Sequence, residues 1–148
     1  MDIEIKVEPI RFQLHGLFAD VANHQYGEVG CRIMDQLWKI VKRDNMSTTG
    51  INHWVYLDND RMFVGIELLD KMASANADLS EYDFQLKRYA EFLHVGPYQQ
   101  LPQVWQSLKS QLTQQGERVT LPSLEVYGHA SVDADTPPET TILISLRG

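Results

Sequence analysis

A single carboxylate stands among apolar neighbours in the segment 122–127, and it is the residue of this chain best suited to chemistry. Alternation along the predicted strand places Leu124 and Val126 on one face and Glu125 and Tyr127 on the other. We expect the apolar pair to face the helices. A carboxylate on an apolar face is costly to desolvate, so Glu125 should have a raised pKa that falls when a cation arrives.

A second predicted strand, 51–57, supplies aromatic partners for that carboxylate. Val55 has the parity expected to face the helices, whereas Trp54 and Tyr56 point to the opposite face, across from Glu125. A carboxylate surrounded by aromatic rings suits a flat lipophilic cation, because stacking, cation–π attraction and charge pairing act together. The pattern therefore predicts a small-molecule ligand of this kind.

Two further residues are candidates for the same site. Glu67 lies on a similarly alternating segment, and Gly65 beside it would let a ligand approach closely. The alternative for Glu67 is a solvated strand residue. Tyr98 follows a Gly-Pro turn, where it would either overhang the mouth of the cleft or pack within the turn.

An enzymatic alternative uses the same carboxylate. Glu125 would act as general base on water, with Tyr127 or Tyr56 donating to the leaving oxygen of an electrophilic substrate. The sequence has no HExxH pair, no GxSxG elbow, no phosphate loop and no dinucleotide fingerprint. The histidines are dispersed and Cys31 is the single cysteine, so we expect no metal and no cofactor. Binding is the preferred interpretation and hydrolysis the alternative.

Composition restricts the partners. A chain of 148 residues with 43% hydrophobic residues fits one folded domain, 1–148. The net charge of −7 argues against direct nucleic-acid binding, and no apolar run is long enough to cross a membrane. The acidic, alternating amino terminus is unlike a signal peptide, and a single cysteine fits a reducing compartment, so we expect a cytoplasmic protein. Blocking of a basic groove on a protein partner remains a third functional class.

The elements that would position these residues occur twice. Apolar residues at helical spacing predict helices over 28–43 and 100–115, and alternation or β-rich composition predicts the strands. The expected strands are 3–14 with a break at Pro9, 51–57, 62–69, 83–95, 124–132 and 140–146. Residues 16–27 are turn-rich, 58–60 form a hairpin turn, 70–80 connect the halves with room for a helical turn, and 133–138 form a loop. Each half is strand, helix, strand, strand, with repeats at about 3–69 and 83–147.

The second half resembles the gyrase-inhibitor-like (GyrI-like) family, the effector-binding domain also fused to some multidrug-responsive transcription regulators. The resemblance is strongest between residues 89 and 146 and weaker between residues 12 and 69. It is carried by Tyr89-Ala90, Phe92, His94, Gly96-Pro97-Tyr98, Leu101, Trp105, Pro122, Leu124-Glu125-Val126-Tyr127, Pro137-Pro138-Glu139 and Ile144-Ser145-Leu146.

The resemblance implies an α+β fold of two strand-helix-strand-strand modules related by pseudo-two-fold symmetry. It implies one curved antiparallel sheet with helices on one face and a ligand cleft on the other. Family members bind lipophilic, often cationic compounds around a central glutamate, which matches Glu125. Members include a gyrase inhibitor, so DNA gyrase is an expected protein partner, and others resemble hydrolases of electrophilic compounds. With no helix-turn-helix ahead of the domain, we expect a stand-alone binder of small molecules.

Overall fold

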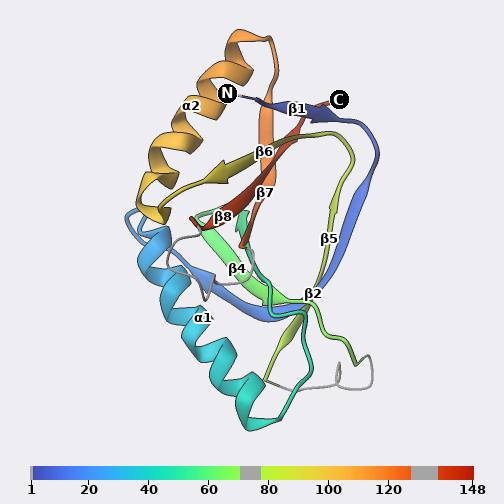
Figure 1. The fold of residues 1–148 in the computed structure, drawn as a ribbon, viewed down its shortest axis with the longest axis vertical. Helices are drawn as coiled ribbons and strands as arrows, with labels where there is room; N and C mark the ends of the chain where they lie inside the picture. Colours follow the sequence, from blue (N-terminus) through green and yellow to red (C-terminus); the bar gives the residue numbers. More distant parts are fainter. Residues whose placement is uncertain (1, 71–77, 128–136) are drawn as a thin grey trace.

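The computed structural model describes residues 2–70, 78–127 and 137–148, which build one antiparallel sheet and two helices. Both helices lie on the same side of the sheet (Figure 1). The elements are β1 (Glu4–Lys6), β2 (Ile10–Asp20), α1 (Tyr26–Arg43), β3 (Asn52–Leu57), β4 (Arg61–Ile66), β5 (Ser80–Leu86), β6 (Tyr89–Val95), the 3₁₀ turn η2 (Tyr98–Gln100), α2 (Leu101–Gln114), β7 (Val119–Tyr127) and β8 (Glu139–Leu146). Neither helix is both long and apolar enough to cross a membrane.

The strand order shows the duplication. The eight strands run β1-β6-β8-β7-β3-β4-β2-β5, so the two triplets β6-β8-β7 and β3-β4-β2 mirror each other about the centre. Each triplet comes from a strand-helix-strand-strand unit, as predicted. The edge strands are exchanged, because β1 pairs with β6 of the second unit and β5 pairs with β2 of the first. Neither unit therefore completes its part of the sheet alone.

The centre of the sheet is the pairing of β3 with β7. In this antiparallel register Trp54 lies opposite Glu125, and Val55 lies opposite Leu124. The dipeptide Val-Tyr occurs in both strands, as Val55-Tyr56 and Val126-Tyr127, and the sequence offset between the two copies also relates Trp54 to Glu125. The pseudo-two-fold axis therefore passes through the Trp54–Glu125 pair.

The two faces of the sheet are buried by different means. On the helix face, the buried stripe of α1 packs on Trp54, Met62 and Val64, and that of α2 packs on Ile142 and Ile144. On the opposite face, the buried cluster consists of strand residues alone: Leu14, Val55, Phe63, Phe84, Leu86, Tyr89, Leu124 and Leu143. Since strands from both halves contribute to this second cluster, the curved sheet buries that face against itself.

Several strand boundaries differ from the predictions: β7 begins at Val119 and not at 124, and β4 ends at Ile66 and not at 69. Strand β2 runs through Gly16 to Asp20, where we expected turns, because Gly16 permits a close crossing: a Cβ there would lie 1.9 Å from the carbonyl oxygen of Val64. The predicted strand 83–95 is two strands, β5 and β6, which pair at opposite ends of the sheet. The predicted helical turn within 70–80, the strand end 128–132 and most of the 133–138 loop lie outside the described residues.

A glycine in α1 sets how closely the helix approaches the central strands. A Cβ on Gly30 would lie 2.3 Å from Cζ3 of Trp54, whereas a Cβ on Gly27 in the same helix meets nothing within 4 Å. We predict that Gly30→Ala lowers the free energy of unfolding by about 1–2 kcal/mol relative to Gly27→Ala, since overpacking outweighs the gain in helix propensity. Urea unfolding of both variants measures this difference. Equal stabilities would show that Trp54 relaxes without cost.

Candidate ligand-binding site

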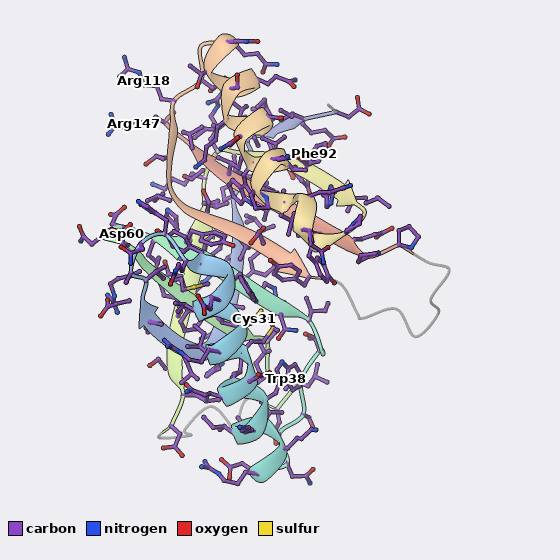
Figure 2. All side chains as sticks on the ribbon, turned by 90° about the vertical axis from the view of Figure 1, so that its left-hand side faces the viewer. Cys31, Trp38, Asp60, Phe92, Arg118 and Arg147 are labelled. Carbon is purple, nitrogen blue, oxygen red and sulfur yellow. The ribbon has the colours of Figure 1, made fainter. Side chains whose placement is uncertain are left out.

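A cavity of about 900 Å³ opens on the helix face, above the two central strands. Residues of both helices line it, and so do residues of β3 and β7. Figure 2 shows Cys31, a lining residue, on the part of α1 nearest to α2. We expected the cleft on the face without helices, and this was wrong. That face is closed by the cluster around Leu14, Val55 and Leu124, so the space that remains lies beside the helices.

Glu125 lies at the cavity and is almost completely buried, with 1% of its surface exposed. Three neutral donors hold its carboxylate. The hydroxyls of Tyr56 and Tyr127 both donate to Oε1, the latter at 3.0 Å, and Nε1 of Trp105 donates to Oε2 at 2.9 Å. These donors come from β3, β7 and α2, so the carboxylate joins three elements. No lysine or arginine of the described residues forms an ion pair with it.

The walls around the carboxylate are aromatic. Tyr56 stands edge-on to Trp105, with ring centroids 5.7 Å apart, and Trp54 stands edge-on to Tyr127 at 5.3 Å. Tyr98 extends the second pair, with its ring 5.4 Å from that of Tyr127. Edge-to-face contacts suit aromatic rings, because the positive edge of one ring meets the negative face of the other. The site therefore combines one anion with several π-faces.

Burial governs the protonation of this group. Desolvation raises the pKa of the Glu125 carboxyl above its ordinary value of 4.5, and the hydrogen bonds from Tyr56, Trp105 and Tyr127 partly oppose that rise. Desolvation and the nearby carboxylate raise the pKa values of Tyr56 and Tyr127, so both hydroxyls stay protonated as donors. An ionised Glu125 is thus held by neutral groups only.

The structure brings together most of the residues singled out in the sequence. Glu125, Tyr127, Trp54, Tyr56 and Tyr98 all line the cavity. We predicted that the four strand residues, Glu125, Tyr127, Trp54 and Tyr56, share one face of the sheet, and they do. We expected that face to be the one without helices, whereas it is the face that the helices cover.

Glu67 is not among the residues that line the cavity. Its carboxylate lies 3.5 Å from Nε2 of buried His53, whose ring packs against Phe12 at 5.1 Å. His53 has the same strand parity as Val55, so Glu67 belongs with the face opposite the cavity.

Trp105 is a residue of the site that the sequence analysis did not predict. Its place among the apolar residues of the predicted helix 100–115 indicates a core position, yet its indole N–H donates to Glu125 and its ring lines the cavity. One signal was present: a buried indole N–H needs an acceptor, and Glu125 is the carboxylate with apolar neighbours in the following strand. Tyr26, Met34 and Lys109 also line the cavity and were not predicted.

A buried carboxylate in an aromatic cavity, on a duplicated α+β sheet, defines a small-molecule-binding domain. The chain belongs to the GyrI-like small molecule binding domain family, whose model matches residues 58–147. Among curated proteins, none matches this sequence significantly.

Solved structures share the fold at low sequence identity. A structure of SAV2435 bound to tetraphenylphosphonium has a TM-score of 0.71 at 14% identity, over 100% of this chain and 95% of that chain. EcmrR, in a cryo-EM structure of its DNA complex, has a TM-score of 0.72 at 14% identity, over 98% of this chain and 57% of that chain. An integron cassette protein of Vibrio cholerae has a TM-score of 0.56 at 13% identity, over 98% and 95%.

The raised pKa of Glu125 predicts a pH-dependent stability difference between wild type and Glu125→Gln. The folded state holds the proton more tightly than the unfolded state, so Glu125 contributes most below pH 4.5 and loses this contribution as pH rises through its folded pKa. The free energy of unfolding of wild type minus that of the variant should therefore fall with rising pH and then level off. Urea titrations across this range measure it. A difference that grows with pH would contradict the assignment.

Proposed function

We propose that this protein binds small lipophilic cations in the cavity, with Glu125 as the counter-ion. One observation carries the proposal: a carboxylate that is 1% exposed faces an aromatic cavity and has three neutral donors but no cationic partner among the described residues. A buried charge in a protein is normally paired. The ligand would supply the missing positive charge.

The cavity suits a bulky aromatic ligand. Its volume of about 900 Å³ is at the upper end of the range typical of small-molecule sites. The proposed ligand-binding residues are Glu125, Tyr127, Trp54, Tyr56, Tyr98 and Trp105. The aromatic members of this set offer cation–π and edge-to-face contacts to such a ligand. The similar fold of SAV2435 was captured with tetraphenylphosphonium, a cation with four phenyl groups, and this supports a ligand of the same class.

The geometry favours binding over hydrolysis. A general base needs a lone pair directed at the attacking water. Here two donors occupy Oε1 and one occupies Oε2, so of the carboxylate's acceptor positions little more than one lone pair on Oε2 is left for a water. Such donors stabilise the anion without a proton transfer, which suits a counter-ion.

Two further points belong to the same proposal. Residues 1–148 act as one binding unit, and the protein acts without contacting DNA.

The proposal predicts that loss of the charge affects cations selectively. Glu125→Gln should weaken tetraphenylphosphonium binding by about tenfold or more, since a charge-assisted interaction is lost. Binding of triphenylphosphine oxide, a neutral analogue, should change by less than about threefold, because the aromatic contacts remain. Quenching of tryptophan fluorescence reports binding, since Trp54 and Trp105 line the cavity.

Glu67→Gln is the matched control. It removes the same formal charge from a residue that follows directly after β4 and does not line the cavity, so it should leave both affinities unchanged. Equal weakening of the cation and the neutral analogue by Glu125→Gln would overturn the counter-ion role. Equal effects of the two variants would assign any change to net charge.

A further inference from the structure

A lysine stands on the wall of the cavity that should receive a cation. On α2, the residues Leu101, Pro102, Trp105 and Lys109 follow one another on the face that lines the cavity. Nζ of Lys109 lies 5.6 Å from the ring centroid of Trp105, within cation–π range. Lys109 is exposed, so its ammonium occupies the rim and remains hydrated. The indole face nearest the rim is therefore already in contact with a positive charge.

Trp105 connects this ammonium with the carboxylate. The ammonium of Lys109 lies over its ring, and its N–H donates to Oε2 of Glu125 at 2.9 Å. Among the described residues that line the cavity, Lys109 is the one lysine or arginine, whereas Glu125 and Asp60 supply carboxylates. Asp60 already accepts from the hydroxyl of Tyr26 at 3.2 Å and lies 3.7 Å from Nδ1 of His24. Along α2, the cavity thus runs from the carboxylate of Glu125 at its floor to the ammonium of Lys109 at its rim.

This separation of charge bears on which cations fit. A cation without further charge would approach Glu125 past the ammonium and compete with it for the face of Trp105. A cation with an acidic substituent would instead place its positive centre near Glu125 and its carboxylate near Lys109. We propose that Lys109 is a specificity-determining residue that favours lipophilic cations carrying an acidic group over those without one. This inference rests on the proposed function, since it assumes that the cation binds at Glu125.

Two phosphonium ligands of equal shape test the inference. Pentyltriphenylphosphonium carries only the cation, and (4-carboxybutyl)triphenylphosphonium replaces its terminal methyl group by a carboxylate. Lys109→Gln should bind the pentyl ligand about two- to fivefold more tightly, because the competing ammonium is gone, and the carboxybutyl ligand about two- to fivefold more weakly. The ratio of the two affinities should therefore shift by about tenfold at low salt and by less at high salt.

Lys42→Gln is the control for net charge. Lys42 lies exposed in the last turn of α1 and does not line the cavity, so the affinity ratio should stay at the wild-type value. Glutamine has a helix propensity close to that of lysine, and urea unfolding confirms that each variant is folded.

The outcomes separate this inference from the proposed function. If wild type binds the pentyl ligand, Glu125→Gln loses it and Lys109→Gln leaves the ratio unchanged, the role of Lys109 is overturned and the cation site stands. If Lys42→Gln shifts the ratio as much as Lys109→Gln, the effect comes from overall charge and the inference also fails. If wild type binds neither phosphonium, the proposed function and the inference fall together.

Discussion

The buried carboxylate of Glu125 and its three donors form the interaction on which the arrangement of this molecule depends. Tyr56 on β3, Tyr127 on β7 and Trp105 on α2 all meet at its two oxygens. An unpaired buried carboxylate is costly, so each lost donor would leave charge unsatisfied in a desolvated site. The hydrogen bonds therefore hold the central strands and the second helix in one relative position. The same bonds leave the cavity with a fixed negative floor.

The duplication explains why the central cross-strand pair has one carboxylate and not two. The pseudo-two-fold axis passes through the cross-strand pair of Trp54 and Glu125, which occupy equivalent positions in the two units. An identical pair would have placed two carboxylates or two indoles side by side. Two adjacent carboxylates repel each other, and one of them would stay protonated. With tryptophan at the equivalent position, an aromatic wall stands beside the central carboxylate, and the equivalent tyrosines, Tyr56 and Tyr127, both donate to it.

Much of this site follows from strand alternation, but its side of the sheet does not. Period-two patterning correctly groups Glu125 and Tyr127 with Trp54 and Tyr56, since the parity of a strand is local. Which face the helices cover depends on the other strands, and here Val55 and Leu124 pack into a cluster that the curved sheet closes. Trp105 was missed for a similar reason, because its acceptor lies on a strand brought beside it only by the fold.

Under the proposed function, preorganisation is what would suit this site to cations. The donors to Glu125 are tied to two strands and a helix, so the anion keeps its direction when no ligand is present. A cation that arrives needs no reorganisation of the carboxylate, and it meets rings already held edge-to-face. The folded chain already bears the desolvation of the carboxylate, which is visible in its raised pKa. A ligand that restores the charge balance relieves this cost, whereas a neutral ligand of equal shape gains only contact. Under the proposed function, selectivity for charge would therefore arise from the fold, and Lys109 at the rim of α2 would adjust it.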